Sequence, residues 1–116
     1  MGQITVELVL KFILQLIAKR ENMDPRVPED RVPSYDIIEA TIKQIDNTVI
    51  IFRIFYILDR FIYKFQLLKK DTMCIVELPK KLLLDIKTGD LESERKLTVI
   101  LTSFIENADC WNKVET

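Results

Sequence analysis

Residues 48–58 read TVIIFRIFYIL, eleven positions interrupted only by Arg53, and the structure they adopt decides the fold. The run is dominated by Val, Ile, Phe, Tyr and Thr, the residue types that are enriched in strands. Polar pairs bound it, Asp46-Asn47 before it and Asp59-Arg60 after it, as is typical of turns between strands. The alternative is one long helix from Tyr35, but that helix would carry Asp59 in its apolar stripe. We therefore predict a central strand.

Pairing this strand with the next stretch of sequence tests the prediction. A two-residue turn at Asp59-Arg60 would pair Leu58 with Phe61. Since side chains alternate along a strand, that register separates one apolar, aromatic face from one mixed face. A four-residue loop at 69–72 then sets Lys64 opposite Glu77, a favourable cross-strand pair. The predicted apolar face consists of Phe52, Ile54, Tyr56, Leu58, Phe61, Tyr63, Phe65, Leu67, Cys74, Val76 and Leu78.

An earlier strand is predicted within residues 35–45. A two-residue turn at Asp46-Asn47 would bury charged side chains, which is costly. A three-residue loop at 46–48, with Asn47 in the left-handed conformation, turns the isoleucines of this segment inward instead. The sequence thus predicts a four-stranded antiparallel meander over about residues 35–78.

Helices are predicted on both sides of the meander in the sequence. Polar residues recur every four positions within 4–19, which favours an N-terminal helix. Residues 21–34 contain three prolines and are predicted to be an extended linker, with a partner-binding arm as the alternative. Pro79 opens a short helix, Gly89 caps its end and Asp90 starts another. The last helix has the apolar series Leu97, Ile100, Leu101, Phe104, Ile105, Ala108 and Trp111.

The predicted fold class is α+β, a single domain over residues 1–116. It consists of an N-terminal helix, the four-stranded meander and two C-terminal helices packed on the apolar face of the sheet.

The composition offers little for catalysis. The chain has no histidine, which rules out Ser/His/Asp and Cys/His sites, and only two glycines, which rules out a glycine-rich phosphate loop. No catalytic residue, cofactor or metal ligand is assigned. Cys74 and Cys110 match no metal-binding spacing and are expected to be reduced thiols, with a disulfide as the alternative.

Charge and hydropathy bound the partners and the location. A net charge of −1 argues against non-specific nucleic-acid binding. Glu7 and Lys11 interrupt the apolar N-terminal run, so neither a signal peptide nor a membrane span is expected. We expect a cytoplasmic protein.

The mixed face of the predicted sheet provides the only functional candidate. Large apolar side chains there seldom stay in water on a monomer, so either part of a helix or a second copy is expected to cover them. We favour a homodimer joined through this face or the sheet edge. The candidate interface consists of Ile51, Arg53, Phe55, Lys64, Gln66, Ile75 and Glu77.

The expected function is a non-enzymatic interaction or regulatory module, homodimeric and bound to an unidentified protein, from a microbe or a virus. One alternative is a small-ligand binder or histidine-free enzyme with a cup between sheet and helices. Another is nucleic-acid binding through the basic residues of the sheet, such as Arg53, Arg60 and Lys64.

Overall fold

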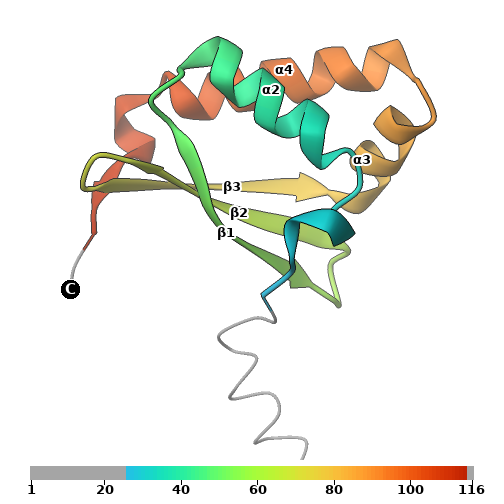
Figure 1. Cartoon of the computed structure of the whole chain (residues 1–116), viewed down its shortest axis with the longest axis horizontal. Helices are drawn as coiled ribbons and strands as arrows, with labels where there is room; N and C mark the ends of the chain where they lie inside the picture. Colours follow the sequence, from blue (N-terminus) through green and yellow to red (C-terminus); the bar gives the residue numbers. More distant parts are fainter. Residues whose placement is uncertain (1–25, 115–116) are drawn as a thin grey trace, which may run out of the picture.

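The computed structural model describes residues 26–114 and has an α+β architecture, with an antiparallel sheet under a layer of helices (Figure 1). The elements follow one another along the chain as η1 (Glu29–Arg31), α2 (Tyr35–Ile45), β1 (Ile50–Ile57), β2 (Ile62–Lys69), β3 (Thr72–Pro79), α3 (Lys80–Lys87), α4 (Leu91–Ile105), η2 (Ala108–Cys110) and β4 (Asn112–Lys113).

The sheet is antiparallel throughout, in the order β1-β2-β3-β4. Several cross-strand pairs match the predicted register, among them Tyr56 with Tyr63, Ile54 with Phe65, and Lys64 with Glu77. This agreement has a physical cause: a slip of one residue would turn each apolar side chain to the opposite face.

One face of the sheet, the inner face, forms the core together with α2, α3 and α4. Figure 1 shows α2 and α4 lying above the strands. Phe65 and Leu67 in β2 share a continuous buried cluster with Ile38 of α2, Leu83 of α3 and Leu101 of α4. The rings of Tyr56 and Tyr63 lie 4.8 Å apart at one end of this layer. The helices are therefore held to the sheet by buried apolar area.

The predicted first strand was wrong, because residues 35–45 form helix α2. Isoleucine favours strands, and this preference guided the prediction, but Ile38 and Ile42 also lie four apart, and both are buried on one side of the helix. The helix ends at Ile45, and the backbone of the next residue, Asp46, is extended, with φ of −155°. Residues 46–49 therefore connect a helix to a strand, and the predicted hairpin loop at 46–48 is absent. The fourth strand of the sheet is β4, from the C-terminal end of the described chain.

Two details of the first hairpin also differ from the prediction. The last β1–β2 pair is Ile57 with Ile62, so the connection has four residues rather than two. Leu58 and Phe61, which were predicted to pair on the core face, lie in this connection and are exposed. On the N-terminal side of Arg53 the register shifts at a bulge. As a consequence, Ile51 rather than Phe52 pairs with Leu67. An extra residue in one strand reverses the orientation of the side chains that precede it. As a result, Ile51 packs against the core and Phe52 is substantially exposed.

The second hairpin keeps the predicted pairing of Leu68 with Met73 and adds one more pair, Lys69 with Thr72. Its loop therefore has two residues, not four. Lys70, the first of them, has φ of 57°.

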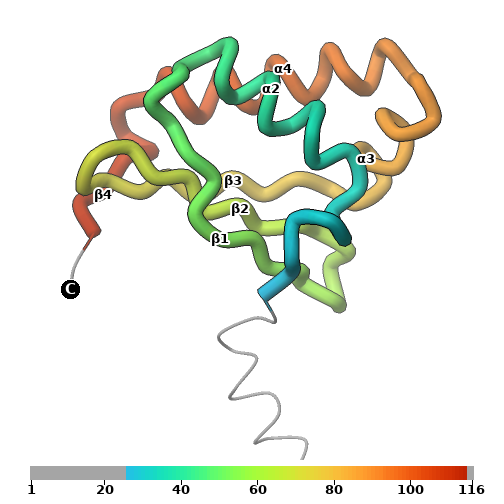
Figure 2. Tube along the Cα trace, viewed as in Figure 1, coloured from blue at the N-terminus to red at the C-terminus, as the bar shows by residue number. Residues whose placement is uncertain are grey.

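The cysteines form a disulfide between Cys74 on β3 and Cys110 in η2, so the expectation of reduced thiols was wrong. The sequence could not show this proximity, because 36 positions separate the two residues. The bond ties the C-terminal segment to the sheet, and Figure 2 shows β4 beside the end of β3 that is remote from α3. The indole Nε1 of Trp111 also donates to the carbonyl of Ile105 at 2.9 Å.

The boundary between α3 and α4 matches the sequence prediction. Gly89 has φ of 92°, the left-handed conformation that ends many helices. Asp90 caps α4, its carboxylate accepting from the backbone N–H of Glu92 and from the hydroxyl of Ser93.

The predicted N-terminal helix at 4–19 lies outside the described residues, as do residues 21–25 of the predicted linker. The remainder of that segment is built into the fold. Arg26 bridges to Phe55 of β1, residues 29–31 form one 3-10 turn, and Val32 is buried in the core.

Candidate interaction surface

The candidate surface is the face of the sheet opposite the core, here called the outer face. In an antiparallel sheet, residues directly opposite one another point to the same side. The register therefore places two neighbouring rows on this face, Arg53–Gln66–Ile75 and Phe55–Lys64–Glu77. Six of the seven predicted interface residues are thus brought together.

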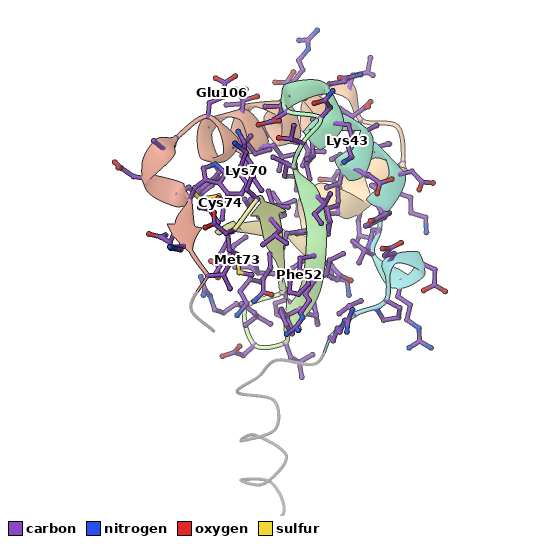
Figure 3. All side chains as sticks on the ribbon, turned by 60° about the vertical axis from the view of Figure 1, so that its left-hand side comes forward. Lys43, Phe52, Lys70, Met73, Cys74 and Glu106 are labelled. Atoms are coloured by element: carbon purple, nitrogen blue, oxygen red, sulfur yellow. A yellow bond between two sulfur atoms is a disulfide. The ribbon has the colours of Figure 1, made fainter. Side chains whose placement is uncertain are left out.

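The seventh, Ile51, lies on the inner face because of the bulge. Ile50 takes its place on the outer face, paired with Leu68. Phe52, which was assigned to the core, is 41% exposed. Figure 3 shows Phe52 and Met73 on the side of the sheet away from Lys43 and Glu106 of the helix layer. Nothing in the sequence marks the bulge, since neither Gly nor Pro occurs within β1.

Apolar side chains on the outer face remain substantially exposed. Ile50 and Ile75 are each 47% exposed, similar to Phe52. Phe55 is an exception at 8%, with Arg26 bridged to its backbone and the Lys64 ammonium 5.4 Å from its ring centroid. The surface thus combines an anchored aromatic ring with exposed aliphatic groups.

Cations on this face lie over aromatic rings. The Arg53 guanidinium is 4.6 Å from the centroid of Phe52, a distance at which the ring quadrupole attracts the charge. At the edge of the face, Arg60 and Glu77 form an ion pair at 3.5 Å. Both partners are well exposed, so the pair adds little to stability. It leaves charges of both signs beside apolar groups, which is the composition of an interface rim.

Titratable groups with perturbed pKa values occur elsewhere in the described chain. Hydrogen bonds from Lys69 and then Thr48 hold the pKa of Asp46 well below its usual range. Burial of Tyr35 is the main cause that raises its pKa, and the negative charge of the nearby Glu39 carboxylate raises it further. The Tyr35 hydroxyl donates a hydrogen bond to the Glu39 carboxylate at 3.2 Å. Burial also raises the pKa of Tyr63.

Further features of residues 26–114 bear on ligand chemistry. Within this range every buried side-chain nitrogen or oxygen has a hydrogen-bond partner, and no three Cys, Asp or Glu side chains gather closely enough to hold a metal ion. Phe65, Leu67 and Leu97 are among the side chains buried between the helices and the sheet, where a ligand cup was considered. In the same part of the chain no helix has the length and hydropathy needed to cross a bilayer.

Comparison with protein-family models, with curated proteins and with solved structures found no match to this chain.

Proposed function

We propose that this protein is a non-enzymatic interaction module that forms a homodimer through the outer face of its sheet and binds a further protein, acting as an accessory or regulatory component of a microbe or a virus. One observation supports the proposal: two rows of predicted interface residues lie side by side on the outer face, next to the exposed side chains of Ile50 and Phe52. The rows are Arg53–Gln66–Ile75 and Phe55–Lys64–Glu77.

Self-association is supported by the composition of this surface. A two-fold axis places the same patch on both sides of an interface, so the patch must complement itself. The outer face can do so, because it contains aliphatic groups for the centre and both Arg53 and Glu77 for reciprocal ion pairs. Arginine and aromatic residues are also the types enriched in interface centres.

Light scattering after size-exclusion chromatography tests the proposal on the full chain. We expect a dimer at high micromolar concentration. Arg53→Glu should raise the dissociation constant by about tenfold or more, because it sets like charges against each other across the axis. Lys96→Glu, on the exposed surface of α4, is the matched control and should leave the constant unchanged. A monomeric full chain would refute the dimer, and equal effects of the two substitutions would refute this interface.

The proposed location must take the disulfide into account. An ordinary cytosol keeps thiols reduced, whereas intracellular proteins of hyperthermophiles are rich in disulfides. We therefore propose the cytoplasm of a hyperthermophilic host, where the Cys74–Cys110 bond would persist.

A further inference from the structure

Residues 108–114, here called the C-terminal segment, form one side of a hollow at the edge of the outer face. Met73 and Ile75 flank the buried Cys74 along β3, so their side chains point outward. Asn112 of β4 pairs with Met73 and therefore points to the same side. The hollow has a volume of about 530 Å³, and it is lined by Met73, Ile75, Cys110, Asn112, Lys113 and Val114.

This hollow is continuous with the surface proposed for self-association. Ile75 lines the hollow and also ends the row Arg53–Gln66–Ile75. Ile75 and Val114 are 47% and 38% exposed, so the exposed apolar surface continues from the sheet onto the C-terminal segment. A second copy that covers this row would therefore contact the C-terminal segment as well.

The disulfide is the covalent anchor of the C-terminal segment. Cys110 is bonded to Cys74, which is fully buried in β3, so residue 110 cannot leave the sheet while the bond is intact. The other anchors are slight. β4 has two residues, both exposed, and the Val114 N–H donates to the Asp71 carbonyl at 2.9 Å. Exposed backbone hydrogen bonds with few buried apolar contacts are typical of the least stable parts of a fold.

Trp111 lies between the disulfide and β4 and reports on the position of the C-terminal segment. Its side chain is half-buried against the core, and its indole Nε1 donates to the carbonyl of Ile105 at the end of α4. It is the only tryptophan in the chain. The exposure of its indole to a quencher therefore measures whether the C-terminal segment is in place.

We propose that the Cys74–Cys110 disulfide is a redox switch that controls the dimer, an inference that rests on the proposed self-association through the outer face. The oxidised bond holds the C-terminal segment in place as part of the interface. Reduction allows the segment to leave β3, which removes one side of the hollow and weakens the dimer. The rest of the fold remains intact, because the fully buried side chains shared by the helices and the sheet end at Ile105.

The switch requires a dithiol as reductant. A thiolate of the dithiol attacks the Sγ of Cys110, which is the less buried of the two cysteines, and displaces the Sγ of Cys74. The second sulfur of the reductant then displaces the Sγ of Cys110. Two electrons and two protons pass from the dithiol to the protein, so both cysteines end as thiols and the reductant ends as a disulfide.

Sedimentation equilibrium of the full chain, with and without dithiothreitol, tests the switch. We expect reduction to raise the dimer dissociation constant by about tenfold, as for the loss of one apolar side chain from an interface. The Cys74→Ala/Cys110→Ala variant should match the reduced protein in both conditions.

Two further measurements on the same samples locate the change within the fold. Acrylamide quenching of Trp111 should increase by about twofold or more on reduction. Hydrogen exchange should accelerate at the amide of Val114, whereas the amide of Phe65 in β2 should keep its protection.

A pair of valine variants separates the hollow from general effects. Val114→Ser removes an apolar side chain from the hollow and should weaken the oxidised dimer. It should have little further effect on the reduced protein, because reduction has already removed this residue from the interface. Val99→Ser, at an exposed position of α4, is the matched control and should change neither constant.

The outcomes distinguish the switch from the proposed dimer. A dimer with the same dissociation constant in both redox states would overturn the switch and leave the proposed dimer intact. A monomer in both states would refute the dimer and the switch together. Loss of protection at Phe65 on reduction would overturn the switch, because the bond would then stabilise the whole fold rather than the C-terminal segment.

Discussion

At the scale of single residues, Asp46 connects α2 to the sheet. Its carboxylate accepts hydrogen bonds from the Lys69 ammonium at 2.6 Å and from both the N–H and the hydroxyl of Thr48, at 3.0 and 2.6 Å. Lys69 is the last residue of β2, so the contact joins the C-terminal end of α2 to the end of β2 that leads into the β2–β3 turn. These donors favour the charged form of the carboxyl and thereby lower its pKa.

The lowered pKa predicts a pH dependence of stability. The hydrogen bonds of the Asp46 carboxylate contribute their full share to folding stability above the unfolded pKa of about 3.9. That stabilisation is lost as the pH falls toward the lower pKa of the folded protein. Asp46→Asn should therefore be less stable than the unchanged chain at pH 7 and should lose less stability between pH 5 and pH 2. Urea midpoints across this range measure the effect.

Asp85→Asn provides the matched comparison for that series. Its exposed pair with Lys81, four residues away on α3, should contribute little at any pH. Acid profiles of equal steepness for the unchanged chain and Asp46→Asn would contradict the role given to Asp46.

At the scale of elements, the β2–β3 loop contains an unfavourable residue. A positive φ at Lys70, the first of the two loop positions, is the φ pattern of a type II′ turn, where Gly is preferred. The hydroxyl of Thr72 donates to the Lys69 carbonyl at 2.7 Å and helps to close the turn.

Lys70→Gly should stabilise the protein. Relief of the left-handed strain exceeds the entropic cost of glycine, which leaves a gain of about 0.5–1 kcal/mol in the free energy of unfolding. Asp71→Gly is the control, because Asp71 has a negative φ and the change should be neutral or destabilising. Chemical denaturation of both variants measures the difference, and a loss of stability in Lys70→Gly would contradict this account of the turn.

Elements also differ in how far the sequence predicts them. The β1–β2–β3 register was predictable because Tyr63, Phe65 and Leu67 alternate strictly with polar or less buried neighbours. Helix α2 was not, because Ile38, Ile42 and Ile45 fit a helical stripe and a β-rich segment equally well. The bulge at Phe52 was not predicted either, because no Gly or Pro marks it in the sequence. Because of the bulge, Ile51 lies on the inner face and not on the candidate surface.

At the scale of the whole molecule, the Cys74–Cys110 disulfide joins the sheet to the C-terminal end of the described chain. Cys74 is fully buried on the inner face, and two residues separate η2 from the end of α4. The bond therefore closes a loop that contains α3 and α4. Linking residues 36 positions apart restricts the unfolded chain substantially.

Reduction should lower the free energy of unfolding by about 3–4 kcal/mol, the value expected for a loop of this length. Urea denaturation with and without dithiothreitol measures it. The Cys74→Ala/Cys110→Ala double variant should match the reduced protein and show no response to the reductant. An unchanged urea midpoint on reduction would contradict the prediction.

The sequence by itself determined the α+β class, the β1–β2–β3 pairing and the α3–α4 boundary. Each of these depends on local signals, namely side-chain alternation, turn residues and caps at Gly89 and Asp90, which act over a few neighbouring positions. Only the tertiary structure decided that residues 35–45 are helical, that Phe52 bulges outward and that Cys74 meets Cys110. These outcomes depend on which distant surfaces pack together, because burial against the shared core overrides weak local preference and brings remote residues into contact.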